Sequence, residues 1–506
     1  MKSQTLSRRD FLKLASMGLI SASGLRGARL IGLAGQPLSG KPRWRPLPPE
    51  NTDVLSEAQK ARLIAASREF LAADEQAANQ VALDIDFIEG ANEHSSTMCG
   101  PLSISILRSA ELLGIWAKPR DFWLLNPRED HTTAPKVFPK ELYYWYEFEE
   151  PISEFDFQRT PLLAGDMLYL DAAPGDTFEH MLVVNRVDDR GRAYSVSNFF
   201  TETGTLIEDR MLYDPASKGE GQIYRWADRR YRNTIGTTGS GGFRIWRVKD
   251  GRSLELPTDP ANVRLHGSLD ELLFGGEGEW FASIKEVGGA QLYQFNPFEV
   301  FHPASTIKVL IALGFYAWLE DQKVRSFDDF ITERGTAGRT YQQLLRAMIV
   351  ESEEKATEAL VGFLGAEWLE EVWEDWGLNA SRANPRRSRA IEVAEALEGL
   401  YTGKWITAES RGHLLGLMAE YTKSDEGRLG LIRGKLPTGS VIYNKRGSLV
   451  EAPRVVADSG IIQIGASGPA YIFSLHGLGR DGSSYEALEA TLDEAVLAFG
   501  EFLTSV

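Results

Sequence analysis

A turn-rich stretch at residues 249–262 divides the sequence into two parts, and this division limits the fold more than any other feature. Residues 243–248 alternate in polarity like a final strand, and a new hairpin pattern begins at Glu279. A chain of 506 residues also exceeds what one hydrophobic core usually supports. The sequence therefore predicts two domains, at residues 54–250 and 262–506.

The charge and the cysteine content exclude several classes of protein. The chain has 55 Lys and Arg residues against 71 Asp and Glu residues. Such an acidic chain is not expected to bind nucleic acid, because phosphate contacts need clustered basic side chains. One cysteine cannot form an internal disulfide or a cysteine-rich zinc site, and no His-Glu-x-x-His spacing occurs. We expect neither a metal nor a cofactor.

The first part of the chain, residues 1–40, is basic, unlike the rest. Arg8 and Arg9 precede an uncharged, largely apolar run at residues 14–25. This run is too short to span a bilayer, which takes about 20 residues as a helix. The pattern resembles a twin-arginine export signal, and a basic amphipathic helix is the alternative. The resemblance implies an exported protein of the periplasm, cell wall or medium, with no membrane span once the signal is removed. Residues 41–53 are rich in proline and predict a stiff tether.

The single cysteine lies where a nucleophilic thiol would work. Apolar residues at helical spacing occur at residues 54–80, and again after Cys99, Gly100 and Pro101. A helix that starts here would place the Cys99 thiol beside unpaired amides and the helix dipole, which favour the thiolate. The thiolate is the nucleophile in thiol catalysis. A buried, inert thiol is the alternative.

A histidine and an asparagine are predicted to meet in the same domain. Residues 180–187 and 192–199 are expected to form a hairpin, which places His180 close to Asn198 on one face. An amide beside an imidazole can fix its tautomer and direct the other ring nitrogen toward a sulfur. Cys99, His180 and Asn198 are therefore a candidate thiol site. A core histidine and an asparagine beside a turn are the alternative.

This arrangement resembles the papain-like peptidases of the C39-like group, which share a Cys-Gly-Pro helix start and a later hairpin that bears a histidine. The resemblance covers residues 80–250. It implies a papain-like α+β domain with peptidase or amidase activity. Asn92 stands in the region where that group carries a glutamine that stabilises the oxyanion.

A serine stands one helical turn before a lysine in the second domain. Ser305 and Lys308 open a long apolar run to Leu319, which predicts a helix with both side chains on one face. A neutral lysine there can take the serine proton, and the Ser305 amide can help to hold an oxyanion. Burial and a second cation nearby would both lower the pKa of Lys308.

Further segments complete this domain. Residues 348–356 are predicted to begin another helix, which supplies a second serine, Ser352, and residues 441–448, 455–462 and 470–475 are predicted strands. The chain closes with a predicted helix at residues 485–502. Strands at both ends of a helical middle indicate an α+β domain.

This order of segments resembles the class A β-lactamase and penicillin-binding family across residues 262–506. The family's Ser-x-x-Lys motif falls on Ser305 and Lys308, its Ser-Asp-Asn motif on residues 352–354, and its Lys-Thr-Gly motif on residues 445–447. The resemblance implies an acyl-enzyme hydrolase, without a cofactor, whose partner is a peptidoglycan peptide or a β-lactam-like small molecule.

The resemblance also implies a role for each residue. Ser305 is the acylated nucleophile and Lys308 its base, while Ser352 relays a proton to the leaving nitrogen. Lys445 holds the substrate carboxylate and lowers the pKa of its neighbours. The backbone amides of Ser305 and Ser448 form the oxyanion hole. The expected substrate contacts are Glu354, Arg446, Gly447 and Ser448.

Three departures from the family bear on the activity. Glu354 replaces an amide, Arg446 replaces a small hydroxyl residue, and residues 377–387 contain no acid where class A lactamases carry the glutamate that activates the deacylating water. Without that base an acyl-enzyme should persist, which favours a penicillin-binding or DD-peptidase-like role. A true β-lactamase is one alternative. A catalytically degenerate cell-wall binding protein that keeps both folds as scaffolds is another.

Overall fold

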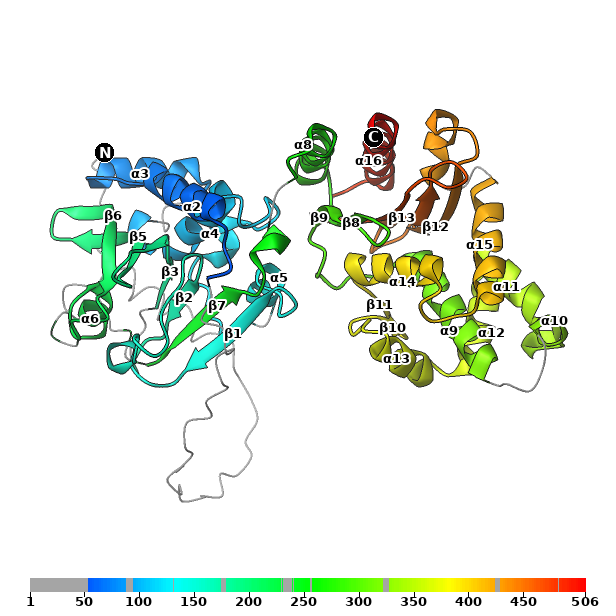
Figure 1. Cartoon of the computed structure of the whole chain (residues 1–506), viewed down its shortest axis with the longest axis horizontal. Coiled ribbons are helices and arrows are strands. Elements are labelled where there is room, and N and C mark those ends of the chain that lie inside the picture. The colour runs from blue at the N-terminus through cyan, green and yellow to red at the C-terminus, as the bar shows by residue number, and fades with distance from the viewer. Residues whose placement is uncertain are drawn as a thin grey trace, which may run out of the picture. The chain divides into compact units, whose positions relative to one another are not determined.

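The chain folds into two compact units, which the computed structural model shows in Figure 1. Unit 1 runs to Leu254 and unit 2 continues from Glu255, but unit 2 also includes Gly114–Trp116 and Pro135–Pro139. The predicted export signal, the tether up to residue 52, and Asn92 lie outside the described residues. The structure describes residues 53–87, 94–130, 132–173, 179–228, 230, 239, 241–254, 257–321, 327–423, 428–480 and 482–506.

Unit 1 combines helices with two antiparallel sheets. The helices are α2 (Glu57–Glu69), α3 (Glu75–Asp84), α4 (Cys99–Ser109) and α6 (Gln222–Ala227), and α5 (Thr133–Val137) begins in unit 1 and ends in unit 2. The strands are β1 (Tyr143–Phe148), β2 (Met167–Leu170), β3 (His180–Val183), β4 (Arg186–Val187), β5 (Ala193–Thr201), β6 (Gly204–Tyr213) and β7 (Phe243–Val248). One sheet has the order β1-β7-β2-β3 and the other β4-β5-β6.

Local capping divides the first predicted helix in two. Ser56 and Gln59 form a capping box at the start of α2, in which each side chain bonds the backbone of the other residue. Asp74 then caps α3 by accepting a hydrogen bond from the Ala77 amide at 2.8 Å. The single helix expected at residues 54–80 is therefore wrong, because a second cap restarts the helix at Glu75.

A buried ion pair lies within unit 1. Arg247 donates from Nε to Asp166 Oδ1 at 2.7 Å and from Nη2 to Asp166 Oδ2 at 2.6 Å. Both residues are buried, and the Arg247 guanidinium also donates to the Pro161 carbonyl. This pair ties β7 to the loop before β2, because bidentate geometry fixes both partners.

Unit 2 is built on one five-stranded antiparallel sheet with the order β12-β13-β14-β8-β9. The strands are β8 (Glu279–Glu286), β9 (Gln291–Phe295), β12 (Val441–Leu449), β13 (Val455–Gln463) and β14 (Ala470–Leu478), and a two-stranded hairpin joins β10 (Arg382–Ala383) to β11 (Arg386–Arg387). The helices are α8 (Pro260–Gly275), α9 (Ile307–Asp321), α10 (Phe327–Ile331), α11 (Tyr341–Ile349), α12 (Glu354–Leu364), α13 (Ala366–Asp375), α14 (Ala390–Thr402), α15 (Ala408–Lys423) and α16 (Tyr485–Ser505).

The sheet of unit 2 is covered on both faces. Helices α8 and α16 form one hydrophobic core with it, and α9, α11, α14 and α15 form another with Ile461 and Ile472 on the opposite face. The three strands predicted toward the end of the chain and the closing helix are confirmed as β12, β13, β14 and α16. Strands from both ends of the unit thus enclose a helical middle, as an α+β fold requires.

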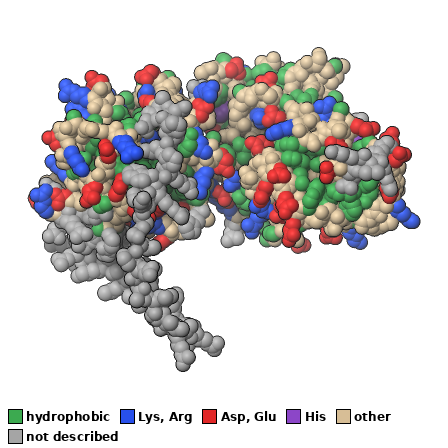
Figure 2. All heavy atoms as spheres, turned by 60° about the horizontal axis from the view of Figure 1, so that its bottom comes forward, with side chains coloured by type: hydrophobic (Ala, Val, Ile, Leu, Met, Phe, Trp, Pro, Cys, Tyr) green, Lys and Arg blue, Asp and Glu red, His purple; other side chains and the backbone are tan. Residues whose placement is uncertain are grey.

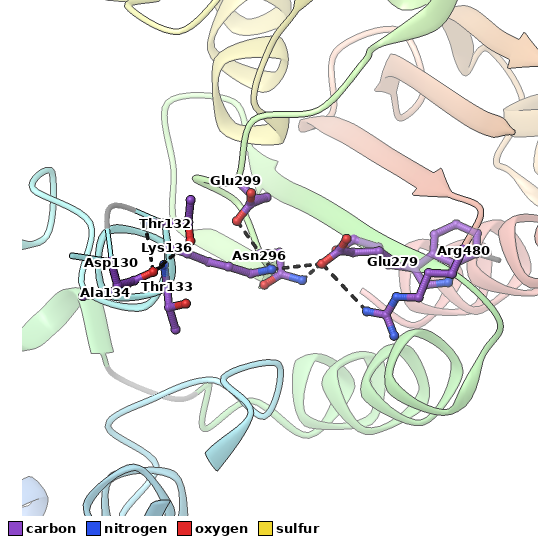
Figure 3. Close-up of polar contacts among 10 residues, drawn as sticks. Asp130, Thr132, Thr133, Ala134, Lys136, Glu279, Asn296, Glu299 and Arg480 are labelled. Atoms are coloured by element: carbon purple, nitrogen blue, oxygen red, sulfur yellow. Dashed lines mark hydrogen bonds and ion pairs between the residues drawn. The ribbon is translucent and has the colours of Figure 1, made fainter. Parts of the chain in front are cut away.

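Charged side chains of both signs share the surface of unit 2. The Lys136 amine lies 2.9 Å from Glu279 Oε1 and 3.4 Å from Glu299 Oε2, and Figure 3 shows Arg480 on the other side of Glu279. Figure 2 shows acidic and basic side chains interspersed over its visible face. Within the described part of the chain, no helix combines the length and the apolar character needed to cross a membrane.

Candidate active site

A short turn presents Ser305 at the start of a largely buried helix of unit 2. Ser305 lies in a 3-10 turn, η6 (Ala304–Thr306), and is partly exposed, whereas α9 is buried from Ile307 to Tyr316. The turn is held by its neighbours: the Ala304 amide donates to His302 Nδ1 at 3.1 Å, and Thr306 Oγ1 donates to the Pro303 carbonyl at 2.7 Å. Ala304 has a φ of 47°, which is unfavourable for a residue with a Cβ.

Lys308 lies one turn further along α9 and is almost completely buried, with 1% of its surface exposed. Its amine donates to the Ser352 carbonyl at 2.7 Å and to Ser352 Oγ at 3.3 Å. It also lies 3.3 Å from Glu354 Oε2. Burial lowers the pKa of Lys308, the Glu354 carboxylate opposes this change, and the Arg386 guanidinium adds to it.

Ser352 joins α11 to α12 in a strained conformation. Its φ of 54° lies in the left-handed region, where side chains other than glycine are unfavourable. This conformation directs both the carbonyl and the hydroxyl of Ser352 at the Lys308 amine. Both Ala304 in the nucleophile turn and Ser352 beside Lys308 therefore have a strained backbone.

The edge strand β12 packs against the nucleophile turn through Gly447. A Cβ placed on Gly447 would lie 3.0 Å from Ala304 Cβ, 3.0 Å from the Pro303 carbonyl oxygen and 3.1 Å from the Ser305 amide nitrogen. Lys445 precedes Gly447 by two residues, so both lie on the same face of β12. The Lys445 amine is buried over the Tyr421 ring at 4.1 Å and donates to the Arg446 carbonyl at 3.2 Å.

The Arg446 side chain does not lie on the same face of β12 as Lys445 and Gly447. Its side chain lies on the opposite face of β12, where the guanidinium contacts Glu489 and donates to the Tyr485 hydroxyl at 3.1 Å. The reason is the alternation of side chains along a strand, which turns the neighbour of Lys445 away from η6. Ser448 follows Gly447 and its side chain is exposed.

Glu354 connects two cations at the site. Besides its contact with Lys308, its other carboxylate oxygen accepts from Arg386 of the β10–β11 hairpin. The side chain of Glu354 is 49% exposed and that of Arg386 is 21% exposed. Although partial burial acts against it, the two cations hold the pKa of Glu354 below its usual range. The sequence analysis did not single out Arg386, which is 32 residues from Glu354 in the chain.

A buried carboxylate holds the segment that carries Arg386. Glu392 of α14 accepts from the Ala380 amide at 2.8 Å and from Ser381 Oγ at 2.7 Å. Glu392 is 3% exposed, and burial raises the pKa of its carboxyl group. Glu370 of α13 accepts from the Ala383 amide at 3.0 Å. The hairpin is therefore fixed to both helices.

Residues 265–488 match the family model described as the β-lactamase enzyme family. This region of the chain is β-lactamase-like. The match contains Ser305, Lys308, Ser352 and Lys445, and it lies entirely within unit 2. No curated protein matches the chain in sequence.

Three solved structures illustrate what the chain is similar to. The TLA-3 extended-spectrum β-lactamase is 16% identical, over 48% of this chain and 99% of its own, with a TM-score of 0.41. A β-lactamase from Xanthomonas campestris pv. campestris is 19% identical, over 48% and 98%, with a TM-score of 0.41. PBP-A is 20% identical, over 48% and 99%, with a TM-score of 0.39.

Outside the β-lactamase-like region, Cys99 is the first residue of α4 in unit 1, two residues before the position expected from Pro101. Ser103 Oγ donates to the Cys99 carbonyl at 2.8 Å and to the Met181 carbonyl at 3.4 Å, so the start of α4 lies beside β3. Burial raises the pKa of the Cys99 thiol and the Glu179 carboxylate adds to the rise, although the Met181 amide acts against it. The thiolate expected from the helix terminus is thus not favoured, because burial outweighs the helix amides.

His180 and Asn198 have different partners from those expected. His180 Nε2 is 2.9 Å from the Ser197 hydroxyl, and the imidazole packs against the Trp226 ring at an interplanar angle of 49°. The Asn198 amide donates to the carbonyls of Ser95 and Ser96, just before Cys99. The predicted pairing of His180 with Asn198 is wrong, because Ser197 and Asn198 point to opposite faces of β5.

Proposed function

We propose that unit 2 is a serine hydrolase that acts through an acyl-enzyme on β-lactam or peptidoglycan-peptide amides. One observation carries this proposal: Lys308, buried on α9 one turn after Ser305, donates to both the carbonyl and the hydroxyl of Ser352. A buried amine that contacts one serine hydroxyl, on a helix one turn after another serine, suits proton transfer from that second serine. The family match to this region supports the same reaction class.

In the proposed reaction, Ser305 Oγ attacks the substrate carbonyl while its proton passes to the neutral Lys308 amine. The carbonyl carbon gains a bond to Oγ and loses its bond to nitrogen, and Ser352 passes the proton to that nitrogen. The amides of Ser305 and Ser448 stabilise the negative oxygen of the intermediate. Lys445 holds a carboxylate of the substrate.

The fate of the acyl-enzyme follows from the segment at residues 377–387. It contains no carboxylate of its own, and the nearby Glu392 is bound to Ala380 and Ser381. We therefore propose slow deacylation, as in a penicillin-binding or DD-peptidase-like protein.

Fluorescent penicillin tests the proposed function. Stable labelling that disappears in Ser305→Ala supports it, whereas rapid turnover of nitrocefin supports a true β-lactamase. A folded protein that is not labelled supports the cell-wall binding alternative and contradicts the hydrolase.

A second activity, a cysteine peptidase or amidase in unit 1, is proposed on the position of Cys99 at the start of α4 beside the strand that begins with His180. Because burial favours the protonated thiol, attack requires a base that removes the proton during the reaction. Iodoacetamide tests this proposal. Alkylation of Cys99 faster than that of free cysteine, and slowed in His180→Ala, supports it; alkylation no faster than that of free cysteine contradicts it.

Export by the twin-arginine route is proposed from Arg8 and Arg9 alone. A reporter fused to residues 1–45 tests it. Export should be lost when both arginines are replaced by lysine, and export that survives this change contradicts the proposal.

A further inference from the structure

The amine of Lys308 has three polar neighbours. They are the Ser352 carbonyl at 2.7 Å, Ser352 Oγ at 3.3 Å and Glu354 Oε2 at 3.3 Å. An ammonium group has three N–H donors and no lone pair, so the three acceptors match it. A neutral amine has only two donors and needs one of its neighbours to donate to it. The Ser352 hydroxyl can donate as well as accept, so these contacts satisfy either form, and the charges nearby decide between them. Only the neutral form can take a proton from Ser305.

Glu354 is the described contact of Lys308 that favours its charged form. It lies in the first turn of α12, where the helix dipole favours an acid, and its side chain is 49% exposed. Arg386 binds the other oxygen of the same carboxylate. The guanidinium repels the Lys308 ammonium and attracts the charge of Glu354, so it opposes the effect of Glu354 on Lys308.

We propose that Glu354 and Arg386 are positioning residues that together set the pH at which Lys308 becomes a base for Ser305. Glu354 holds Lys308 as an ammonium, and Arg386 weakens that hold by sharing the carboxylate. This inference rests on the proposed function in that Ser305 is the nucleophile that uses Lys308, but the charge of Lys308 can be measured without any reaction.

The other charged and titratable groups around this cluster come from each neighbouring element. His302, before η6, experiences both Glu354 and Arg386, and burial lowers the pKa of its imidazole. Lys445 lies on the face of β12 that packs on η6. Glu370 of α13 and Glu392 of α14 are bound to the backbone amides of Ala383 and Ala380. Among these described groups, Glu354 is the acid that contacts Lys308.

The sign of each effect follows from charge alone. Glu354→Gln removes the anion that stabilises the ammonium, so Lys308 should deprotonate at a lower pH, by about one unit or more, as expected for a charge within a few ångström. Arg386→Gln removes the competing cation, so Lys308 should deprotonate at a higher pH. Two changes at one cluster therefore shift the same titration in opposite directions.

Nuclear magnetic resonance of the full chain, labelled with ¹³C at lysine Cε, measures this titration directly. The Lys308 signal is assigned by its loss in Lys308→Arg. Matched controls are Glu358→Gln, an exposed acid one turn further along α12, and Arg387→Gln, the exposed neighbour of Arg386. Both controls should leave the Lys308 midpoint unchanged, and circular dichroism checks that each variant is folded.

The two proposals fail in different ways. If Glu354→Gln and Arg386→Gln both leave the Lys308 midpoint in place, or move it in the same direction, the inference is wrong whatever the activity. If the midpoint moves as expected but a fluorophosphonate probe labels Ser305 at no pH, the control of the Lys308 charge by Glu354 and Arg386 stands, and the proposed function is wrong. If the inference and the proposed function both hold, the labelling rate of Ser305 falls at low pH with a midpoint. This midpoint shifts in each variant by the same amount as the midpoint of the Lys308 titration.

Discussion

Replacing Gly447 by alanine tests how closely β12 holds the nucleophile turn. The new methyl group would lie 3.0 Å from Ala304 Cβ, 3.0 Å from the Pro303 oxygen and 3.1 Å from the Ser305 nitrogen. Carbon atoms pack best at about 3.5–4.0 Å, so the turn has to move by roughly half an ångström. All three contacts belong to the segment that carries Ser305, so the displacement falls on the nucleophile and its amide.

The magnitude follows from that displacement. Misplacing reacting groups by 1 Å costs about a hundredfold in rate, so half that shift should slow acylation of Ser305 roughly tenfold. Overpacking by one methyl group should cost about 1–3 kcal/mol in the free energy of unfolding. The loss of rate should therefore appear in a protein that is still folded.

The assay is the rate of labelling by a fluorescent acylating probe, together with the melting temperature. Gly412→Ala on the exposed face of α15, where a Cβ meets nothing within 4 Å, is the matched control and should label at the wild-type rate. A Gly447→Ala protein that labels as fast as wild type would refute the close packing of β12 on the turn.

Three further predictions concern stability and proton transfer. His476 is fully buried with its Nε2 bonded to two serine hydroxyls, and burial lowers its pKa to about 3 from 6.5. Protonation therefore favours the unfolded state. The free energy of unfolding of unit 2 should fall by up to about 1.4 kcal/mol per pH unit as the pH falls from 6.5 toward 3. Calorimetry should find a smaller fall in His476→Phe. Arg247→Met should destabilise unit 1 by about 3–5 kcal/mol in denaturant titrations, and adding Asp166→Asn should restore part of the loss. Ser352→Gly should keep the stability within about 1 kcal/mol, because glycine tolerates the φ of 54°, while labelling of Ser305 slows at least about a hundredfold.

The architecture of unit 2 was predictable because its signals are local. Alternation of apolar residues marks β12, β13 and β14, and helical spacing marks α16. The three-residue spacing of Ser305 and Lys308 also needs no knowledge of the tertiary fold to place both on one face of a helix.

Two features of the candidate sites could have been predicted from strand alternation and were not. Lys445 and Arg446 are neighbours on one strand, so only one of them can face η6. In the same way, Ser197 and Asn198 cannot both face His180. Applying the period of two would have placed Arg446 on the face opposite Lys445 and Ser197 on the face opposite Asn198, whereas the residue of each pair that faces the site depends on packing.

The bridge from Glu354 to Arg386 could not be read from the sequence. Its two partners are 32 residues apart, and they meet through the tertiary fold, in which Glu370 and Glu392 bind the segment that carries Arg386. The protonation state of the Cys99 thiol could not be predicted either. The sequence predicts where the helix starts, but the burial that raises the pKa of the thiol depends on packing.

The claim on which this account depends is that Ser305 forms a covalent acyl intermediate. Intact-mass spectrometry of the full chain after exposure to benzylpenicillin measures this directly, followed by peptide mapping of the adduct. We predict one added penicilloyl group on the peptide that contains Ser305, and none in Ser305→Ala. An unmodified folded protein, or an adduct on another residue, would contradict the account.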